Sequence, residues 1–200
     1  SDAVYTKYYT PKEVKALRRY FDNFIVLTDD EWLDFEICLT KEVIQKKAQL
    51  LKQDERCDFI AFIEEGIFRF YTVKDGEEKI TAFFFPGDFV TNYRSFLTGL
   101  PSEHNIEALQ DAVYYKINLL QLKKLYDKHK SIERLGRLIA ENLYLIVARR
   151  LDSFMFDSPA DRYNALVKRD SKLLQEIPQY MIASYLGIKP ETLSRIRARK

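Results

Sequence analysis

The amino-acid sequence predicts an α+β protein in which an antiparallel β sandwich or jelly roll is followed by a long helix and a short all-helical C-terminal part. Three observations support this. Short runs rich in Ile, Phe, Val and Tyr alternate with turn signals between Lys41 and Ile117; continuous helical spacing follows from Ser131 to Met155; and only short helical segments come after Ser158. The 200 residues, 46% of them hydrophobic and 31% charged, are enough to bury a core.

The N-terminal residues are expected to form two helices before the first strand. Between Pro11 and Phe24 the apolar residues recur at helical spacing. Thr28 followed three residues later by Glu31 is the pattern of a capping box, in which a hydroxyl and a carboxylate satisfy backbone N–H groups at a helix start. A second helix is therefore predicted to begin at Thr28, with an apolar face of Trp32, Phe35 and Leu39.

The strand region is divided by glycine-containing turn signals. Several strands at roughly 8 to 12 residue spacing predict a sandwich or jelly roll. No helical stretch long enough for a crossover interrupts them, which disfavours a parallel sheet. The turn signals are Glu64-Glu65-Gly66, Lys74-Asp75-Gly76, Pro86-Gly87-Asp88 and Thr98-Gly99-Leu100-Pro101.

The predicted long helix carries a heptad-like stripe with alternating spacings of four and three. Two structures give such a pattern: the seam of a dimer, which we favour, and a face packed on the protein's own barrel. In a seam, Asn142 would pair with its counterpart and fix the register, whereas on a free face it would meet solvent. The members of the stripe are Leu135, Ile139, Asn142, Ile146 and Arg149.

The chain is predicted to divide at Ser158-Pro159, an N-cap followed by proline at the first helical position. This gives residues 1–130 as N-terminal helices and β-barrel, 131–157 as the long dimerisation helix and 158–200 as the C-terminal domain. Charge follows the division: residues 158–200 hold nine Lys or Arg against four Asp or Glu, a balance of +5, and the rest of the chain sums to −3. Such asymmetry indicates that the C-terminal part meets an anionic polymer.

Membrane insertion and secretion are not expected. No stretch approaches the roughly 18 to 20 apolar residues of a membrane span, and the strongest candidate, 143–148, is bounded by charged residues. The first residues, Ser1-Asp2-Ala3, lack the apolar core of a signal peptide. We therefore expect a cytoplasmic protein with no membrane partner.

Metal, cofactor and enzymatic chemistry are not expected either. Cys38 and Cys57 have no second pair near them, which argues against zinc or a Cys-ligated iron-sulfur cluster and favours buried free thiols. His104 and His129 are the only histidines. No nucleophile elbow, phosphate-cradling glycine loop or carboxylate-pair motif is present, so the sequence gives no reason to expect an enzyme.

The C-terminal residues have the pattern of a helix, a tight turn and a second helix. Pro178 opens a helix that continues to Leu186, Gly187 ends it, and Pro190 starts the next. In a DNA-binding motif of this kind, the second helix enters the major groove and presents short polar or guanidinium side chains to base edges. The alternative is an ordinary core hairpin whose arginines only solvate the exposed face.

The side chains left outward by this arrangement suit DNA. Arg195 can contact guanine with two hydrogen bonds, and Glu191 can accept one from cytosine. The basic residues at the end of the chain, Arg197, Arg199 and Lys200, suit phosphates. The full set of predicted DNA contacts is Gln179, Tyr180, Lys189, Glu191, Thr192, Ser194, Arg195, Arg197 and Arg199.

Residues 186–196 (LGIKPETLSRI) closely resemble the helix-turn-helix of the Crp/Fnr family of bacterial regulators. Residues 85–89 (FPGDF) resemble the family's Pro-Gly-Asp turn, and residues 149–151 (RRL) lie where its long helix often carries such residues. The resemblance covers nearly the whole chain. It implies a cyclic-nucleotide-binding-like jelly roll as sensor domain, a dimerisation helix and a winged-helix-like DNA-binding domain, with Glu191 and Arg195 reading bases. Pro190 departs from the family, which often has Arg there.

The resemblance also implies a ligand pocket. In family members that bind cyclic nucleotides, a Gly-Glu-Leu segment and an Arg-Ser or Arg-Thr pair hold the ribose and phosphate; the aligned residues here are 91–93 (TNY) and 102–103 (SE). A buried phosphate needs a guanidinium, which is missing at that position, so weak or no binding of cyclic AMP is expected. An empty barrel, an unknown ligand and a cyclic nucleotide remain as alternatives. The candidate pocket residues are Asn92, Tyr93, Arg94, Ser95, Glu103 and His104.

Together these features predict a homodimeric DNA-binding regulator that reads a near-palindromic operator through its paired helix-turn-helix motifs. RNA polymerase is a candidate further partner, and a small-molecule effector is unknown. The main alternative is a cyclic-nucleotide-binding-like regulatory or interaction domain that binds no DNA and only docks its terminal helices on the barrel.

Overall fold

The computed structural model describes residues 14–169, 171 and 173–198. They form two compact units: the described residues of the first are 14–70 and 83–141, and those of the second lie within 71–82 and 142–198. The division into three domains at residues 130 and 157 stays a prediction.

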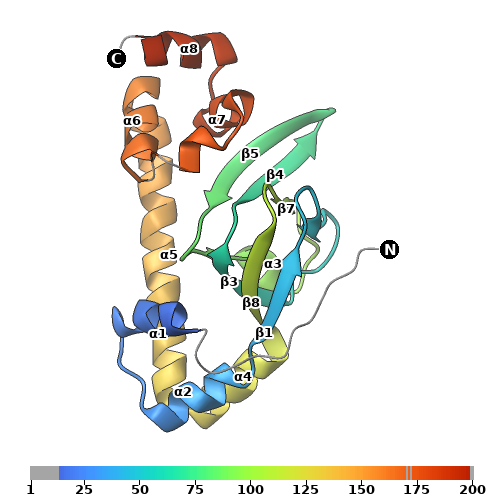
Figure 1. Ribbon diagram of the computed structural model, residues 1–200, viewed down its shortest axis with the longest axis vertical. Coiled ribbons are helices and arrows are strands. Elements are labelled where there is room, and N and C mark those ends of the chain that lie inside the picture. The colour runs from blue at the N-terminus through green and yellow to red at the C-terminus, as the bar shows by residue number, and fades with distance from the viewer. Residues whose placement is uncertain (1–13, 170, 172, 199–200) are drawn as a thin grey trace. The chain divides into compact units, whose positions relative to one another are not determined.

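The first unit contains two N-terminal helices, most of the strands and the beginning of the long helix (Figure 1). The prediction of an antiparallel jelly roll within an α+β chain is confirmed. In chain order the elements up to the end of the long helix, some of which continue into the second unit, are α1 (Lys15–Asp22), α2 (Asp29–Glu36), β1 (Thr40–Ile44), β2 (Gln49–Leu51), β3 (Phe59–Glu65), β4 (Phe68–Lys74), β5 (Glu77–Phe84), β6 (Phe89–Val90), α3 (Tyr93–Thr98), β7 (Asn105–Ala108), β8 (Ala112–Asn118), α4 (Leu119–Lys128) and α5 (Lys130–Phe156).

The capping box predicted at the start of α2 is present. The Thr28 hydroxyl accepts from the backbone N–H of Glu31, and a Glu31 carboxylate oxygen accepts from the backbone N–H of Thr28 at 2.9 Å. Asn118 and Gln121 cap α4 in the same reciprocal way. Side chains chosen by the local sequence thus satisfy the first N–H groups of both helices.

The roll consists of two four-stranded sheets, with strand orders β1-β8-β3-β6 and β2-β7-β4-β5. Strand β8 pairs antiparallel with β1, where Glu42 lies opposite Tyr114, and with β3, where Phe62 lies opposite Tyr115. Gly66, with φ +93°, ends β3 at a point where a Cβ atom would lie 2.5 Å from the Cβ of Ala112. Glycine is therefore required there by both backbone and contact.

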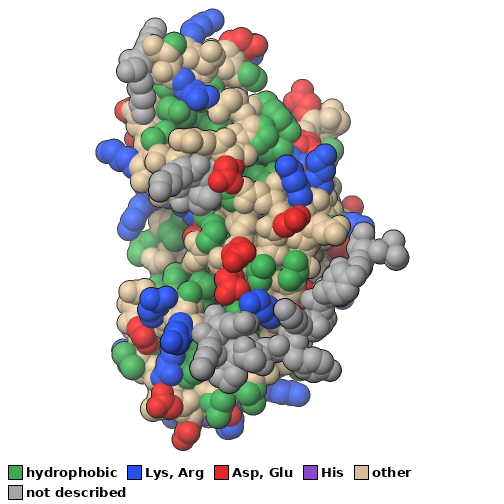
Figure 2. Space-filling view, in the orientation of Figure 1, with side chains coloured by type: hydrophobic (Ala, Val, Ile, Leu, Met, Phe, Trp, Pro, Cys, Tyr) green, Lys and Arg blue, Asp and Glu red, His purple; other side chains and the backbone are tan. Residues whose placement is uncertain are grey.

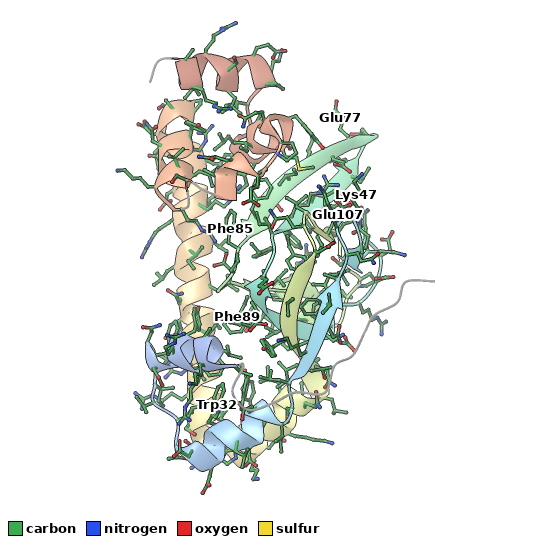
Figure 3. All side chains as sticks on the ribbon, in the orientation of Figure 1. Trp32, Lys47, Glu77, Phe85, Phe89 and Glu107 are labelled. Atoms are coloured by element: carbon green, nitrogen blue, oxygen red, sulfur yellow. The ribbon has the colours of Figure 1, made fainter. Side chains whose placement is uncertain are left out.

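The apolar core of this unit has two clusters. The larger is rich in aromatic rings and joins α1 and α2 to β3, β6, β8 and the first turns of α5. Trp32, labelled in Figure 3, is a buried member of this cluster, and Phe89, also labelled, packs against it; Phe21 packs edge-on against both Trp32 and Phe35. The second cluster fills the roll, with Phe68, Ile106 and Ile63 fully buried. Burial of these rings dominates the stability of the unit.

The long helix α5 spans Lys130–Phe156, close to the predicted Ser131–Met155. Leu135 is buried in the aromatic cluster and Ile139 packs against it, so these two residues contact the protein's own core. Asn142 is half-buried, whereas Ile146 and Arg149 are exposed. The predicted stripe is therefore buried in the protein's own core at its N-terminal end and exposed at its C-terminal end.

The second unit contains the end of α5, the helices α6 (Pro159–Arg169), α7 (Gln179–Leu186) and α8 (Pro190–Ala198), and the 3-10 turn Leu173–Gln175. Ser158 caps α6 as predicted, since its hydroxyl accepts from the backbone N–H of Asp161 at 3.2 Å. The unit also includes the β4–β5 hairpin, residues 71–82, whose Ile80 donates a backbone N–H to the Ser184 hydroxyl at 3.1 Å.

Both cysteines are free: Cys57 is buried as predicted, but Cys38 is only partly buried. Within residues 14–169, 171 and 173–198, no three His, Cys, Asp or Glu side chains gather where they could hold a metal ion. None of the described helices combines the length and the apolar character needed to cross a membrane.

Candidate nucleic-acid interface

The helices α7 and α8 are joined by a three-residue turn that begins at Gly187. Gly187 has φ +67°, the left-handed conformation that favours glycine at a helix C-terminus. The inward side chains of both helices are buried, and Leu193 of α8 is 1% exposed. The others in this core are Leu166, Leu174, Ile177, Met181, Ile182, Ala183 and Leu186. The predicted helix, turn and helix is therefore present with its own apolar core.

The second helix begins at Pro190, as expected, while Pro178 is the N-cap of α7 rather than its first residue. The Lys189 carbonyl accepts from the N–H groups of Thr192 and Leu193. Pro190 has no N–H, so the Glu191 N–H is the one left over in the first turn; together with the helix dipole it favours an anionic partner.

The outward face of α8 carries the side chains predicted to meet DNA. Thr192 is half-buried; the exposed residues of the predicted set are Gln179, Tyr180, Lys189, Glu191, Ser194, Arg195 and Arg197. Arg199 and Lys200 lie outside the described residues. Figure 2 shows basic side chains in blue over α8, beside an acidic one in red.

The charged side chains of this face are not engaged with the rest of the protein. Within the part of the chain that the structure describes, Glu191, Arg195 and Arg197 form no ion pair. Glu191 and Arg195 are four residues apart, so they project from the same side of α8. This side is therefore free to make polar contacts with another molecule.

The predicted ligand pocket has the opposite character. The carboxamide of Asn92 accepts from the backbone N–H of Ser95 at 3.1 Å, which caps α3, and donates to the Ser102 hydroxyl at 2.5 Å. Ser102 also donates to the His104 carbonyl and accepts from the His104 N–H. The Ser95 hydroxyl donates to the Leu100 carbonyl and accepts from the Cys57 N–H. These three buried side chains, here called the Asn92 network, satisfy one another and the nearby backbone.

The other predicted pocket residues lie around this network. Arg94 and Glu103 pair with each other at 3.0 Å, with both side chains exposed to solvent. Tyr93 stacks on Phe96. The His104 ring stacks on Phe70, with centroids 4.3 Å apart, and its burial lowers the pKa of the imidazole below the usual range. The structure thus brings Asn92 and Ser95 together and pairs Arg94 with Glu103.

Two kinds of residue were missed by the sequence analysis. Ser102 was noted only as a replacement for a family arginine, and its place at the centre of a buried network depends on contacts between the N-cap of α3 and the loop before β7, which no local pattern reports. Arg150 and Arg162 contact the end of α7, as described below. The only sequence signal for Arg150 was the pair at 149–150 on the long helix.

The fold and the interface define the class of the protein: a β-roll of the cyclic-nucleotide-binding type, a long helix and a C-terminal helix-turn-helix. The family model of the cyclic nucleotide-binding domain matches residues 41–129. The anaerobic regulatory protein of Haemophilus influenzae is 27% identical over 172 residues, which cover 80% of this chain and 66% of that protein. The chain therefore spans slightly less than two thirds of this relative.

Solved structures agree on the fold. FixK2 from Bradyrhizobium japonicum superimposes with a TM-score of 0.66 at 21% identity, covering 80% of this chain and 83% of that chain. A protein from Eubacterium rectale described as a transcriptional regulator of the Crp/Fnr family also has a TM-score of 0.66, at 17% identity, covering 86% of this chain and 83% of that one. The predicted resemblance to regulators of the Crp/Fnr family is thereby confirmed for the chain as a whole, which shares their fold.

Proposed function

We propose that this protein is a transcription regulator that binds duplex DNA in a sequence-specific manner, as a homodimer, through α8. The unengaged polar face of α8 carries this proposal. Glu191 and Arg195 would read base edges, while Lys189 and Arg197 would contact phosphates. The relatives are named as regulators rather than enzymes, which fits a cytoplasmic, non-catalytic role in which RNA polymerase is a further candidate partner.

Dimerisation would use the second half of α5. Four apolar residues there recur at spacings of three and four: Tyr144, Val147, Leu151 and Met155. All four are exposed, Tyr144 to 71% and Leu151 to 61%. At about 100° per residue they share one face, roughly opposite the face of Leu135 and Ile146. An exposed apolar stripe of this kind is typical of a helical seam with a second copy of the chain.

The seam is tested by comparing Leu151→Glu with Ile146→Glu. Both changes place a carboxylate at an exposed position of the same helix, but only the first lies in the proposed stripe. Sedimentation equilibrium should show a monomer for Leu151→Glu and a dimer for Ile146→Glu. The reverse result would return the seam to the stripe that includes Asn142, Ile146 and Arg149.

Cyclic AMP is not expected to be the effector. The side chains of the Asn92 network already bond one another and the nearby backbone, and Arg94 is paired with Glu103. A phosphate entering here would have to break these bonds without gaining a buried guanidinium. Isothermal titration calorimetry should show no saturable binding, and micromolar affinity would contradict this.

The DNA-binding proposal is tested by selecting bound sites from random duplexes. The expected result is a near palindrome whose half-sites are about one helical turn, roughly 34 Å, apart. A gel shift at low salt should show retardation of any duplex, because phosphate contacts are sequence-independent. Absence of both would favour the alternative, an interaction domain that binds no DNA.

A further inference from the structure

The C-terminal end of α7 has hydrogen-bond donors for all of its last carbonyl groups. A helix leaves four carbonyls there without intrahelical partners. The N–H groups of Gly187 and Ile188 bond the carbonyls of Ser184 and Ala183, each at 3.0 Å, in the pattern of a Schellman motif. The carbonyls of the last two residues of α7 remain, and they need donors from elsewhere.

Two arginines from other helices supply those donors. Arg150, on α5, donates from Nη2 to the Tyr185 carbonyl at 3.3 Å. Arg162, on α6, donates from Nη2 to the Leu186 carbonyl at 3.1 Å. Both guanidinium groups lie at the negative end of the α7 dipole, which favours positive charge there. Three helices therefore meet at the residues that immediately precede the turn to α8.

Ring stacking strengthens the same junction. The guanidinium carbon of Arg150 lies 3.8 Å from the centroid of the Tyr185 ring and 5.0 Å from that of Phe154. The Arg162 guanidinium carbon lies 4.9 Å from the Phe154 ring. Arg150 and Phe154 are four residues apart and share one face of α5, so the helix presents a cation and a ring together.

The junction leaves little room for adjustment. A Cβ atom on Gly187 would lie 3.2 Å from the Phe154 ring. Arg162 also donates from Nη1 to the Asp157 carbonyl at 2.8 Å, which ties the link between α5 and α6 to the end of α7. Arg150 is partly buried, and this burial lowers the pKa of its guanidinium. A cation is thus kept in a partly desolvated position, where the Tyr185 ring and the Tyr185 carbonyl compensate its charge.

We propose that Arg150 and Arg162 are positioning residues that fix the direction of α8 relative to the long helix. They touch no DNA; they hold the end of α7, and α8 follows after a three-residue turn. In a homodimer joined along α5, this sets the separation of the two recognition helices, and thus the half-site spacing that the protein accepts. The inference rests on the proposed function.

The test is a series of operators whose half-sites are moved apart or together by one and two base pairs. The double variant Arg150→Met/Arg162→Met is compared with the control variant Arg134→Met. Arg134 is an exposed arginine on α5, the helix that also carries Arg150. Wild type and Arg134→Met should prefer one spacing by about tenfold, and the double variant should discriminate by less than about twofold. Affinity for an isolated half-site should be unchanged, which a general loss of folding would not allow.

The inference is overturned if the double variant keeps the wild-type preference for one spacing. A second measurement does not depend on DNA: ¹⁵N relaxation of backbone amides in α5 and α8. In the wild type both helices should tumble with one correlation time, and in the double variant α8 should tumble faster. If the wild type bound no duplex, the proposed function would fail, and equal tumbling in the variant would separately overturn the role of the two arginines.

Discussion

The Asn92 network and the outward face of α8 are both rich in polar side chains, but they use them in opposite ways. In the network every hydroxyl and carboxamide group is bonded within the roll. On α8 the charged side chains of Glu191, Arg195 and Arg197 are exposed and unpaired within the described residues. Buried polar groups must be satisfied internally, whereas an exposed free set costs nothing until a partner arrives. The Asn92 network therefore has the character of a structural site, and the outward face of α8 has the character of the proposed binding site.

The largest expected effect is on stability, from Asn92→Ala. This change removes the cap of α3 and leaves the buried Ser102 with one donor fewer, so the free energy of unfolding should fall by about 2 to 3 kcal/mol. The matched control is Asn118→Ala, which removes an exposed cap of α4 and should cost about 1 kcal/mol. Urea denaturation measures both. Equal losses would mean that the Asn92 network is not stabilised by its burial.

The second effect is on binding alone, from Arg195→Ala. Loss of a base contact should reduce affinity for the selected operator by about 1 to 3 kcal/mol, or roughly 5- to 150-fold, and relax specificity at one position of each half-site. Because Arg195 has no partner within the described protein, the melting temperature should stay unchanged. A lower melting temperature together with unchanged affinity for the operator would show that Arg195 stabilises the fold and does not contact DNA.

Arg197→Ala should have a smaller and sequence-independent effect. A lost phosphate contact weakens operator and random duplex alike, and lowers the slope of log affinity against log salt by about 0.9 per protomer. Fluorescence anisotropy over a range of salt concentrations measures the slope. A specific effect on the operator, with no change in slope, would instead assign Arg197 to base reading.

The smallest expected effect is a pH dependence of folding stability, which arises from His104 beside the Asn92 network. Burial lowers the pKa of His104 in the folded state, so the unfolded chain takes up a proton first as the pH falls below about 6.5. Stability contributed by neutral His104 is therefore present above that pH and is lost below it. Between pH 7.5 and 5.5, wild type should lose up to about 1 kcal/mol more than His104→Phe, which keeps a ring beside Phe70. If the free energy of unfolding depended on pH identically in the two proteins, the lowered pKa of His104 would be contradicted.

Local patterns were sufficient for much of the fold. The capping box at Thr28, the long helix to Phe156 and the helix-turn-helix around Gly187 are all encoded within a few residues of themselves, and each was predicted. The short helix α3 was not, because six residues carry no periodicity and its cap Asn92 was interpreted as a ligand residue. Register and pairing between distant strands likewise leave no local signal.

The candidate site was predicted with the same asymmetry. Exposed residues such as Arg195 follow from helical phase, because a buried Leu193 fixes which side of α8 faces outward. The stripe on α5 was harder: Leu135 and Ile139 pack in the protein's own core, although their spacing equally suits a seam. The residues that hold α7, Arg150 and Arg162, act across helices, and sequence spacing cannot reveal such a contact.

The bond from Ile80 to Ser184 has a consequence for solubility. Strand β5 is an edge of its sheet, and the unpaired N–H groups of an edge can pair with a strand from another molecule and start aggregation. The Ser184 hydroxyl occupies one of those N–H groups. A helix of the proposed DNA-binding motif thus also protects a strand edge, and any truncation that removes α7 should leave a chain prone to self-association through β5.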